Sequence, residues 1–88
     1  MSKRGLDWRE DQFTLRETGL RFSRAWDAER QTYIWTSPDC RIVAWGEVIE
    51  DANGSVRKVY RATVDGRQIG YAQPDLRSAM AAGAREAA

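Results

Sequence analysis

The dipeptide Asp65-Gly66 stands between two runs of alternating residues, and it constrains the fold more than any other feature of the chain. A two-residue type I′ turn requires positive φ at both positions, which Asp and Gly tolerate. The pattern therefore predicts a hairpin of strands 56–64 and 67–72, in which Val64 pairs with Arg67. The same register pairs Ala62 with Ile69 and Tyr60 with Tyr71. Because side chains alternate, one face of this hairpin is apolar, and the other carries Arg57, Arg61 and Thr63.

A helix over residues 75–87 follows this hairpin directly. Asp75 can accept hydrogen bonds from the free amides of the first turn, and Pro74 ends the preceding strand. The apolar positions recur at helical spacing, so one stripe is expected to pack on the sheet. This stripe consists of Leu76, Ala79, Met80, Gly83, Ala84 and Ala87.

The upstream chain reads as further strands with turns between them. Alternating or β-rich runs occur at 13–16, 20–26, 32–36 and 41–50. We therefore expect a single α+β domain, an antiparallel meander of five or six strands over 13–72 packed by one C-terminal helix. Residues 1–12 are expected to form an irregular arm.

The segment 41–50 is apolar on both sides, which is typical of a central strand. A turn at Asp51–Gly54 would join it to the strand at 56–64. Loops of two or four residues both place Val43 and Trp45 on the same face as Ala62 and Val64. The two-residue loop also places Glu50 opposite Arg57.

The composition argues against several classes of function. Fourteen basic and 13 acidic residues leave a net charge of +1, and the chain has no histidine and one cysteine, Cys40. The commonest general base is therefore absent, thiolate zinc sites are excluded, and no phosphate-binding glycine loop occurs. Glu47, with Glu50 or Asp51, is the remaining acid–base candidate; alternatively, Glu47 lies at the sheet rim or meets Arg24. We predict no enzyme activity and no cofactor.

No signal peptide or membrane-spanning stretch is recognised in the sequence, so the expected location is the cytoplasm. The lone cysteine is consistent with a reducing compartment, since it cannot form an internal disulfide.

The sheet face away from the predicted helix is the candidate binding surface. Its basic residues would suit nucleic acid, whereas its apolar strip would suit a protein partner or a second copy of the chain. It could also be a solvated face, or be buried by the N-terminal strands in a small barrel. The candidate partner-binding residues are Arg57, Arg61, Val59, Val48, Ile42, Arg67 and Arg21.

The C-terminal third carries a family resemblance. The segment Tyr60-Arg61-Ala62, then Val64, Gly66 and Ile69-Gly70-Tyr71, leads into Asp75-Leu76 and an alanine-rich helix. It resembles the second half of AP2-type and integrase arm-type DNA-binding domains. This resemblance implies a sheet backed by a helix, with Arg57, Arg61 and Arg67 facing DNA.

The short, charge-balanced chain also resembles, in general type, small phage or mobile-element proteins. The resemblance implies action by binding a host protein, as anti-CRISPR proteins do. We therefore expect a non-enzymatic module for protein–protein recognition, of the kind that acts as an inhibitor or adaptor. The alternative is nucleic-acid binding by the basic sheet face.

Overall fold

The computed structural model describes residues 11–88, so residues 1–10 of the expected irregular arm lie outside the described part. Six strands form one antiparallel sheet in sequence order, and a single helix follows them, as expected. Gln12, which was expected to belong to the arm, begins the first strand. The elements are β1 (Gln12–Leu15), β2 (Leu20–Asp27), β3 (Thr32–Thr36), β4 (Ile42–Glu50), β5 (Val56–Val64), β6 (Arg67–Gln73) and α2 (Leu76–Ala87).

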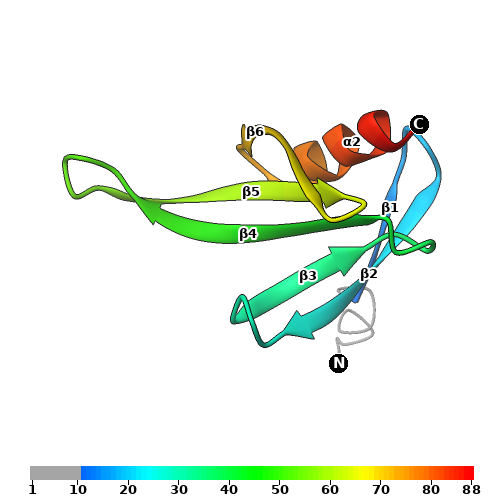
Figure 1. Ribbon diagram of the computed structural model, residues 1–88, viewed down its shortest axis with the longest axis horizontal. Helices are drawn as coiled ribbons and strands as arrows, with labels where there is room; N and C mark the ends of the chain where they lie inside the picture. Colours follow the sequence, from blue (N-terminus) through cyan, green and yellow to red (C-terminus); the bar gives the residue numbers. More distant parts are fainter. Residues whose placement is uncertain (1–10) are drawn as a thin grey trace, which may run out of the picture.

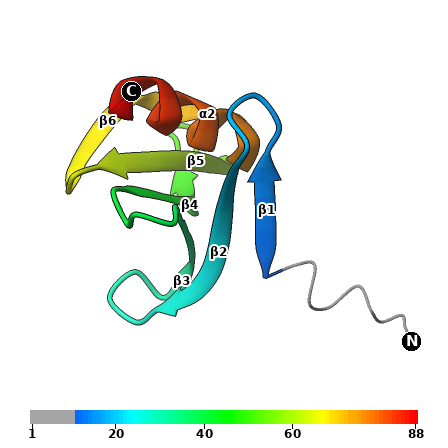
Figure 2. The same ribbon diagram turned by 90° about the vertical axis from the view of Figure 1, so that its right-hand side faces the viewer.

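The sheet is curved, and α2 packs on its concave face. Figure 2 shows the sheet bending from β6 round to β1, with the helix across the opening. The helix contacts β4, β5, β6 and β1. It covers one end of the sheet only, because the hairpin of β4 and β5 extends well beyond it (Figure 1).

The core lies between α2 and the covered end of the concave face. Leu15, Phe22 and Met80 are fully buried there. Around them lie Ile42, Ala44, Ala62, Val64, Ala79 and Ala84. The first two strands thus contribute to the same core as the C-terminal hairpin and the helix.

The Asp65-Gly66 hairpin is confirmed near its turn. Asp65 and Gly66 have φ of 53° and 83°, and Val64 pairs with Arg67. The predicted pairing of Tyr60 with Tyr71 is wrong, because Tyr60 pairs with Gln73. A bulge lies between the pairs Ala62–Ile69 and Tyr60–Gln73, where Gly70 adopts φ of 58°. It adds residues to β6 and leaves Tyr71 89% exposed.

The predicted register of β4 and β5 is also wrong. Glu50 pairs with Val56, and Ile42 with Val64. The amide of Asp51 donates to the Ser55 carbonyl (2.9 Å), and Gly54 takes φ of 83°, which closes a three-residue loop with a bulge. A loop with an odd number of residues shifts the register by one residue compared with the expected loops of two or four. Every side chain of β4 is therefore on the opposite face, relative to β5, from the one expected.

The consequence of this register is a different core face. Ile42 and Ala44 lie with Ala62 and Val64 against the helix, whereas Val43 and Trp45 lie on the opposite, convex face. The sequence-based assignment of Val43 and Trp45 to the core face of the sheet is therefore corrected.

The helix begins as expected. The carboxylate of Asp75 accepts a hydrogen bond from the Ser78 amide (2.8 Å), and Ala79, Met80, Gly83 and Ala84 are buried. A β-carbon at Gly83 would lie 2.6 Å from Cγ2 of Ile42. Glycine at this position thus allows the helix to approach β4 closely.

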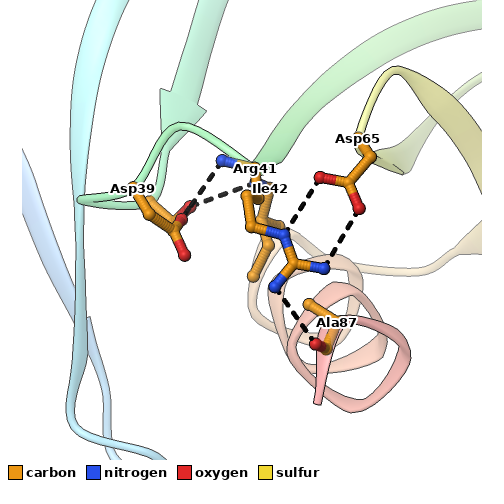
Figure 3. Close-up of polar contacts among 6 residues, drawn as sticks. Asp39, Arg41, Ile42, Asp65 and Ala87 are labelled. Atoms are coloured by element: carbon orange, nitrogen blue, oxygen red, sulfur yellow. Dashed lines mark hydrogen bonds and ion pairs between the residues drawn. The ribbon is translucent and has the colours of Figure 1, made fainter.

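Arg41, in the β3–β4 turn, links the C-terminal end of α2 to the β5–β6 turn. Arg41 donates to both carboxylate oxygens of Asp65 (3.0 Å each) and to the carbonyl of Ala87 (3.4 Å) (Figure 3). The hydroxyl of Ser37 donates to Asp39 and accepts from the Ile42 amide. These contacts hold the β3–β4 turn, the β5–β6 turn and the C-terminus of α2 together.

Acid is expected to destabilise the fold. The hydrogen bonds from Arg41 lower the pKa of Asp65, and those from Ser78 lower the pKa of Asp75. Such groups stay ionised in the folded protein at pH values where the unfolded chain takes up protons. Their stabilising effect is complete above about pH 5.5 and is lost as pH falls through the usual value of 3.8 and then through the lowered folded pKa.

Urea unfolding at several pH values between 7 and 2.5 checks this expectation. Asp65→Asn removes one of the titrating groups, so its stability should fall less steeply with acid than that of the unchanged protein. A stability that stays constant down to pH 3 would contradict the proposed contribution of these carboxylates.

In the part of the chain that the structure describes, no helix has the length and apolar character needed to span a membrane.

Candidate functional site

The part of the concave face that α2 leaves uncovered is the candidate site. The strand registers place even-numbered residues of β2, β4 and β5, and odd-numbered residues of β3, on this face. Leu76, at the start of α2, lies at the boundary of the covered part. The uncovered concave surface beyond Leu76 is here called the mouth. It consists of Arg24, Trp26, Tyr33, Trp35, Gly46, Lys58 and Tyr60.

The mouth contains a hollow of about 260 Å³. Three rings from two strands line it, those of Tyr33 and Trp35 on β3 and that of Tyr60 on β5. A β-carbon at Gly46 would meet Cε of Lys58 at 2.7 Å and the ring of Tyr60 at 2.8 Å. Because position 46 has no side chain, both of these side chains can lie across β4.

Cations contact the aromatic rings of the mouth. The guanidinium of Arg24 lies 4.3 Å from the ring centre of Tyr33, and the ammonium of Lys58 lies 5.6 Å from that of Tyr60. Trp26 meets Tyr33 edge to face, with ring centres 5.2 Å apart. These contacts orient the rings of the mouth.

Two arginines in and beside the mouth form ion pairs with aspartates, so the mouth does not carry a strong positive charge. Arg24 forms an ion pair with Asp11 (2.7 Å), and Arg30 forms one with Asp27. Its surface thus combines aromatic area with local polar groups, which is the usual composition of the centre of a protein interface.

Exposed apolar side chains gather on the same concave face. The side chains are Trp26 (54% exposed), Tyr33 (47%), Val48 (66%) and Val56 (66%). They lie on β2, β3, β4 and β5, beyond the N-terminal end of α2. Large apolar side chains that stay exposed on one face make that face a candidate contact surface.

A second hollow, of about 430 Å³, lies beside the first, between the β2–β3 turn and β4. The guanidinium of Arg30 stacks 4.3 Å from the ring centre of Trp45, whose Nε1 donates to Glu47 (3.3 Å). The two hollows share Thr32, Gly46 and Lys58, so they form one broken groove where β3 and β4 separate.

The residues of the predicted partner-binding strip do not form one surface. Ile42 is 2% exposed beneath α2, and Val59, on the convex face, is 4% exposed. Val48 remains exposed, but on the concave face. The one-residue change in register separates these residues, because it sends even and odd positions of β4 to opposite faces from those expected.

Three of the four predicted basic residues share the face away from the helix, as expected. Arg57, Arg61 and Arg21 belong to the convex face, whereas Arg67 lies at the β5–β6 turn. Arg61 forms an ion pair with Glu47 (3.0 Å), so part of the expected positive charge is neutralised.

Glu47 lies on the convex face, where it contacts Arg61 and Trp45 rather than Arg24. It is not brought together with another carboxylate in the contacts described. Within residues 11–88, no group of three or more His, Cys, Asp or Glu side chains could hold a metal ion. Cys40 is exposed in the β3–β4 turn, with φ of 63°.

The sequence contained a signal for the mouth that residue types alone did not reveal. A nine-residue strand spans roughly 30 Å, whereas a 12-residue helix spans roughly 18 Å. One helix therefore cannot cover the full length of the β4–β5 hairpin. Val48 and Val56 in the uncovered part of this hairpin, and Trp26 and Tyr33 on the neighbouring β2 and β3, are left facing solvent.

No protein-family model, no curated protein and no solved structure matches this chain. The fold is established as an α+β meander of six antiparallel strands packed by one C-terminal helix.

Proposed function

We propose that the protein is a recognition module that binds another protein through the mouth. One observation carries this proposal: four of the five exposed large apolar side chains of the described residues lie on the uncovered concave face, and two of them, Trp26 and Tyr33, belong to the mouth. Trp, Tyr and Arg side chains dominate the binding energy of protein interfaces, and all three occur here around a hollow. An inhibitor or adaptor of the phage type would act in this way.

The charges favour a protein over a nucleic acid as the occupant. The net charge of the chain is +1, and both Arg24 and Arg61 are already paired with carboxylates. Nucleic-acid affinity depends on free cations that neutralise phosphates. The aromatic and aliphatic groups of the mouth would instead be desolvated by an apolar protein surface.

Site-specific photo-crosslinking in cells of the native source tests the proposal. A photoreactive phenylalanine analogue placed at Tyr33 should crosslink to one discrete protein, and Trp26→Ala should remove that product. The matched control is the same analogue at Tyr71, an exposed tyrosine that lines neither hollow. Equal products from both positions, or none from Tyr33, would refute a partner at the mouth.

The cation–aromatic pairs support a second candidate, binding of single-stranded nucleic acid. Bases can stack on Tyr33 and Tyr60 while Lys58 contacts a phosphate. This candidate predicts saturable quenching of tryptophan fluorescence by a thymidine oligonucleotide, weakening steeply as salt is raised. The absence of quenching at low salt would exclude it.

A further inference from the structure

The outer edge of β5 is open where β5 extends beyond β6. The amide of Asp65 donates to Arg41 (2.9 Å) and that of Asp51 donates to Ser55, so odd-numbered residues of the hairpin direct their backbone groups inward. Even-numbered residues of β5 direct theirs toward β6. The pairing with β6 ends at Tyr60, and within residues 11–88 no strand pairs with the outer edge at Val56 and Lys58.

This segment is a two-stranded ribbon, residues 46–59, in which β4 and β5 pair only with each other in the described ladders. Figure 1 shows it projecting beyond the rest of the sheet. Two strands alone are marginally stable in water, and an open edge is a template for another strand. A third strand on β5 would satisfy the outward backbone groups and cover part of Val56.

The charges on this edge select the kind of strand that can pair with it. Arg57 and Lys58 are adjacent, one on each face of the ribbon. A two-fold pairing of the edge with itself, centred on either residue, would place like charges opposite each other, which is unfavourable. A strand with acidic residues at successive positions would place opposite charges across from both.

We infer that the β5 edge at Val56–Lys58 binds an extended, acidic segment of a partner. The segment is added as an antiparallel strand alongside the part of β5 that β6 does not reach. The inference rests on the proposed function, because it takes the partner to be a protein. Backbone hydrogen bonds to Val56 and Lys58 supply the attachment, and the two basic side chains supply the preference for acidic sequences.

The test adds to the full chain a capped seven-residue peptide with glutamate at two successive central positions and valine at the others, and follows the amide NMR signals of the protein. Saturable shifts and slowed hydrogen exchange are expected at Val56 and Lys58. The same peptide with N-methylated alternate amides, or with lysine in place of glutamate, should bind about tenfold more weakly, the effect of roughly one lost backbone hydrogen bond or of like charges. Equal binding of all three peptides, or shifts confined to the mouth, would overturn the inference.

A pair of variants separates the backbone contact from side-chain effects. Val56→Pro removes the outward amide and should weaken binding about tenfold, whereas Val56→Ala keeps it and should bind normally. The amide spectrum of the core shows whether each variant is folded. Arg57→Glu combined with Lys58→Glu, which leaves the backbone unchanged, should favour the lysine peptide. Equal binding by Val56→Pro and Val56→Ala, with no reversal in this double variant, would refute edge pairing.

The outcomes distinguish this inference from the proposed function. Crosslinking at Tyr33 without peptide binding at Val56 would leave the mouth as the binding surface and refute the edge. Peptide binding at Val56 without crosslinking at Tyr33 would support the edge and refute the mouth.

Discussion

Phe22→Ala is expected to destabilise the protein by about 3–5 kcal/mol, because it removes a fully buried ring and leaves a cavity. The ring packs in the core that Leu15 and Met80 also form. A domain of 88 residues has a total stability of roughly 4–13 kcal/mol, so this single change approaches complete unfolding. Urea denaturation followed by tryptophan fluorescence measures the loss.

Trp26→Ala is the matched comparison for this prediction. Trp26 lies on the same strand and the same concave face as Phe22, but it is in the mouth and more than half exposed. Its replacement should cost less than half as much stability. Similar losses from the two variants would show that the concave face is not divided into a packed core and an open mouth.

Gly83→Leu is expected to destabilise the protein by about 3 kcal/mol or more, because any side chain at position 83 must displace Ile42. The intrinsic helix preference for leucine over glycine would offset this by under about 1 kcal/mol. The steric cost therefore decides the sign. Thermal and urea unfolding, with circular dichroism as the readout, measure the effect.

Two further variants test the cause of that effect. Arg85→Leu introduces the same residue on the exposed side of α2 and should change stability by less than about 0.5 kcal/mol. Ile42→Ala makes room beside position 83, so Gly83→Leu combined with Ile42→Ala should cost at least about 1 kcal/mol less than the sum of the single changes. Strict additivity would contradict the close approach of α2 to β4.

The elements whose signals are local could be predicted from the sequence. The turn at Asp65-Gly66 depends on two residues that tolerate positive φ, and the start of α2 depends on Asp75 and the amide of Ser78. The strands follow from alternating residues, and the meander follows because each strand is joined to the next by a short turn. These features involve neighbours in the chain, so no distant contact is needed to specify them.

The binding face could not be predicted because it depends on one residue of register. Loops of even length between β4 and β5 place Trp45 against the helix, whereas the three-residue loop closed by Asp51 and Gly54 places Ala44 there. In this register Ile42 and Ala62 lie beside Gly83, where the helix approaches the sheet closely. The predicted strip of Ile42, Val48 and Val59 was divided between faces for the same reason.

The sequence by itself determined a meander of five or six strands followed by a helix, since each of these elements follows from periodicity, turn residues or a cap within a few positions. Only the tertiary structure decided which face is buried and which part of it stays open. Burial depends on the odd loop at Ala52–Gly54, the bulge at Gly70 and the shortness of α2 relative to β4 and β5. These properties appear only when the strands are paired and the helix is docked. The register sets which face of the sheet each side chain is on, and the length of α2 sets which of the side chains on the concave face stay exposed.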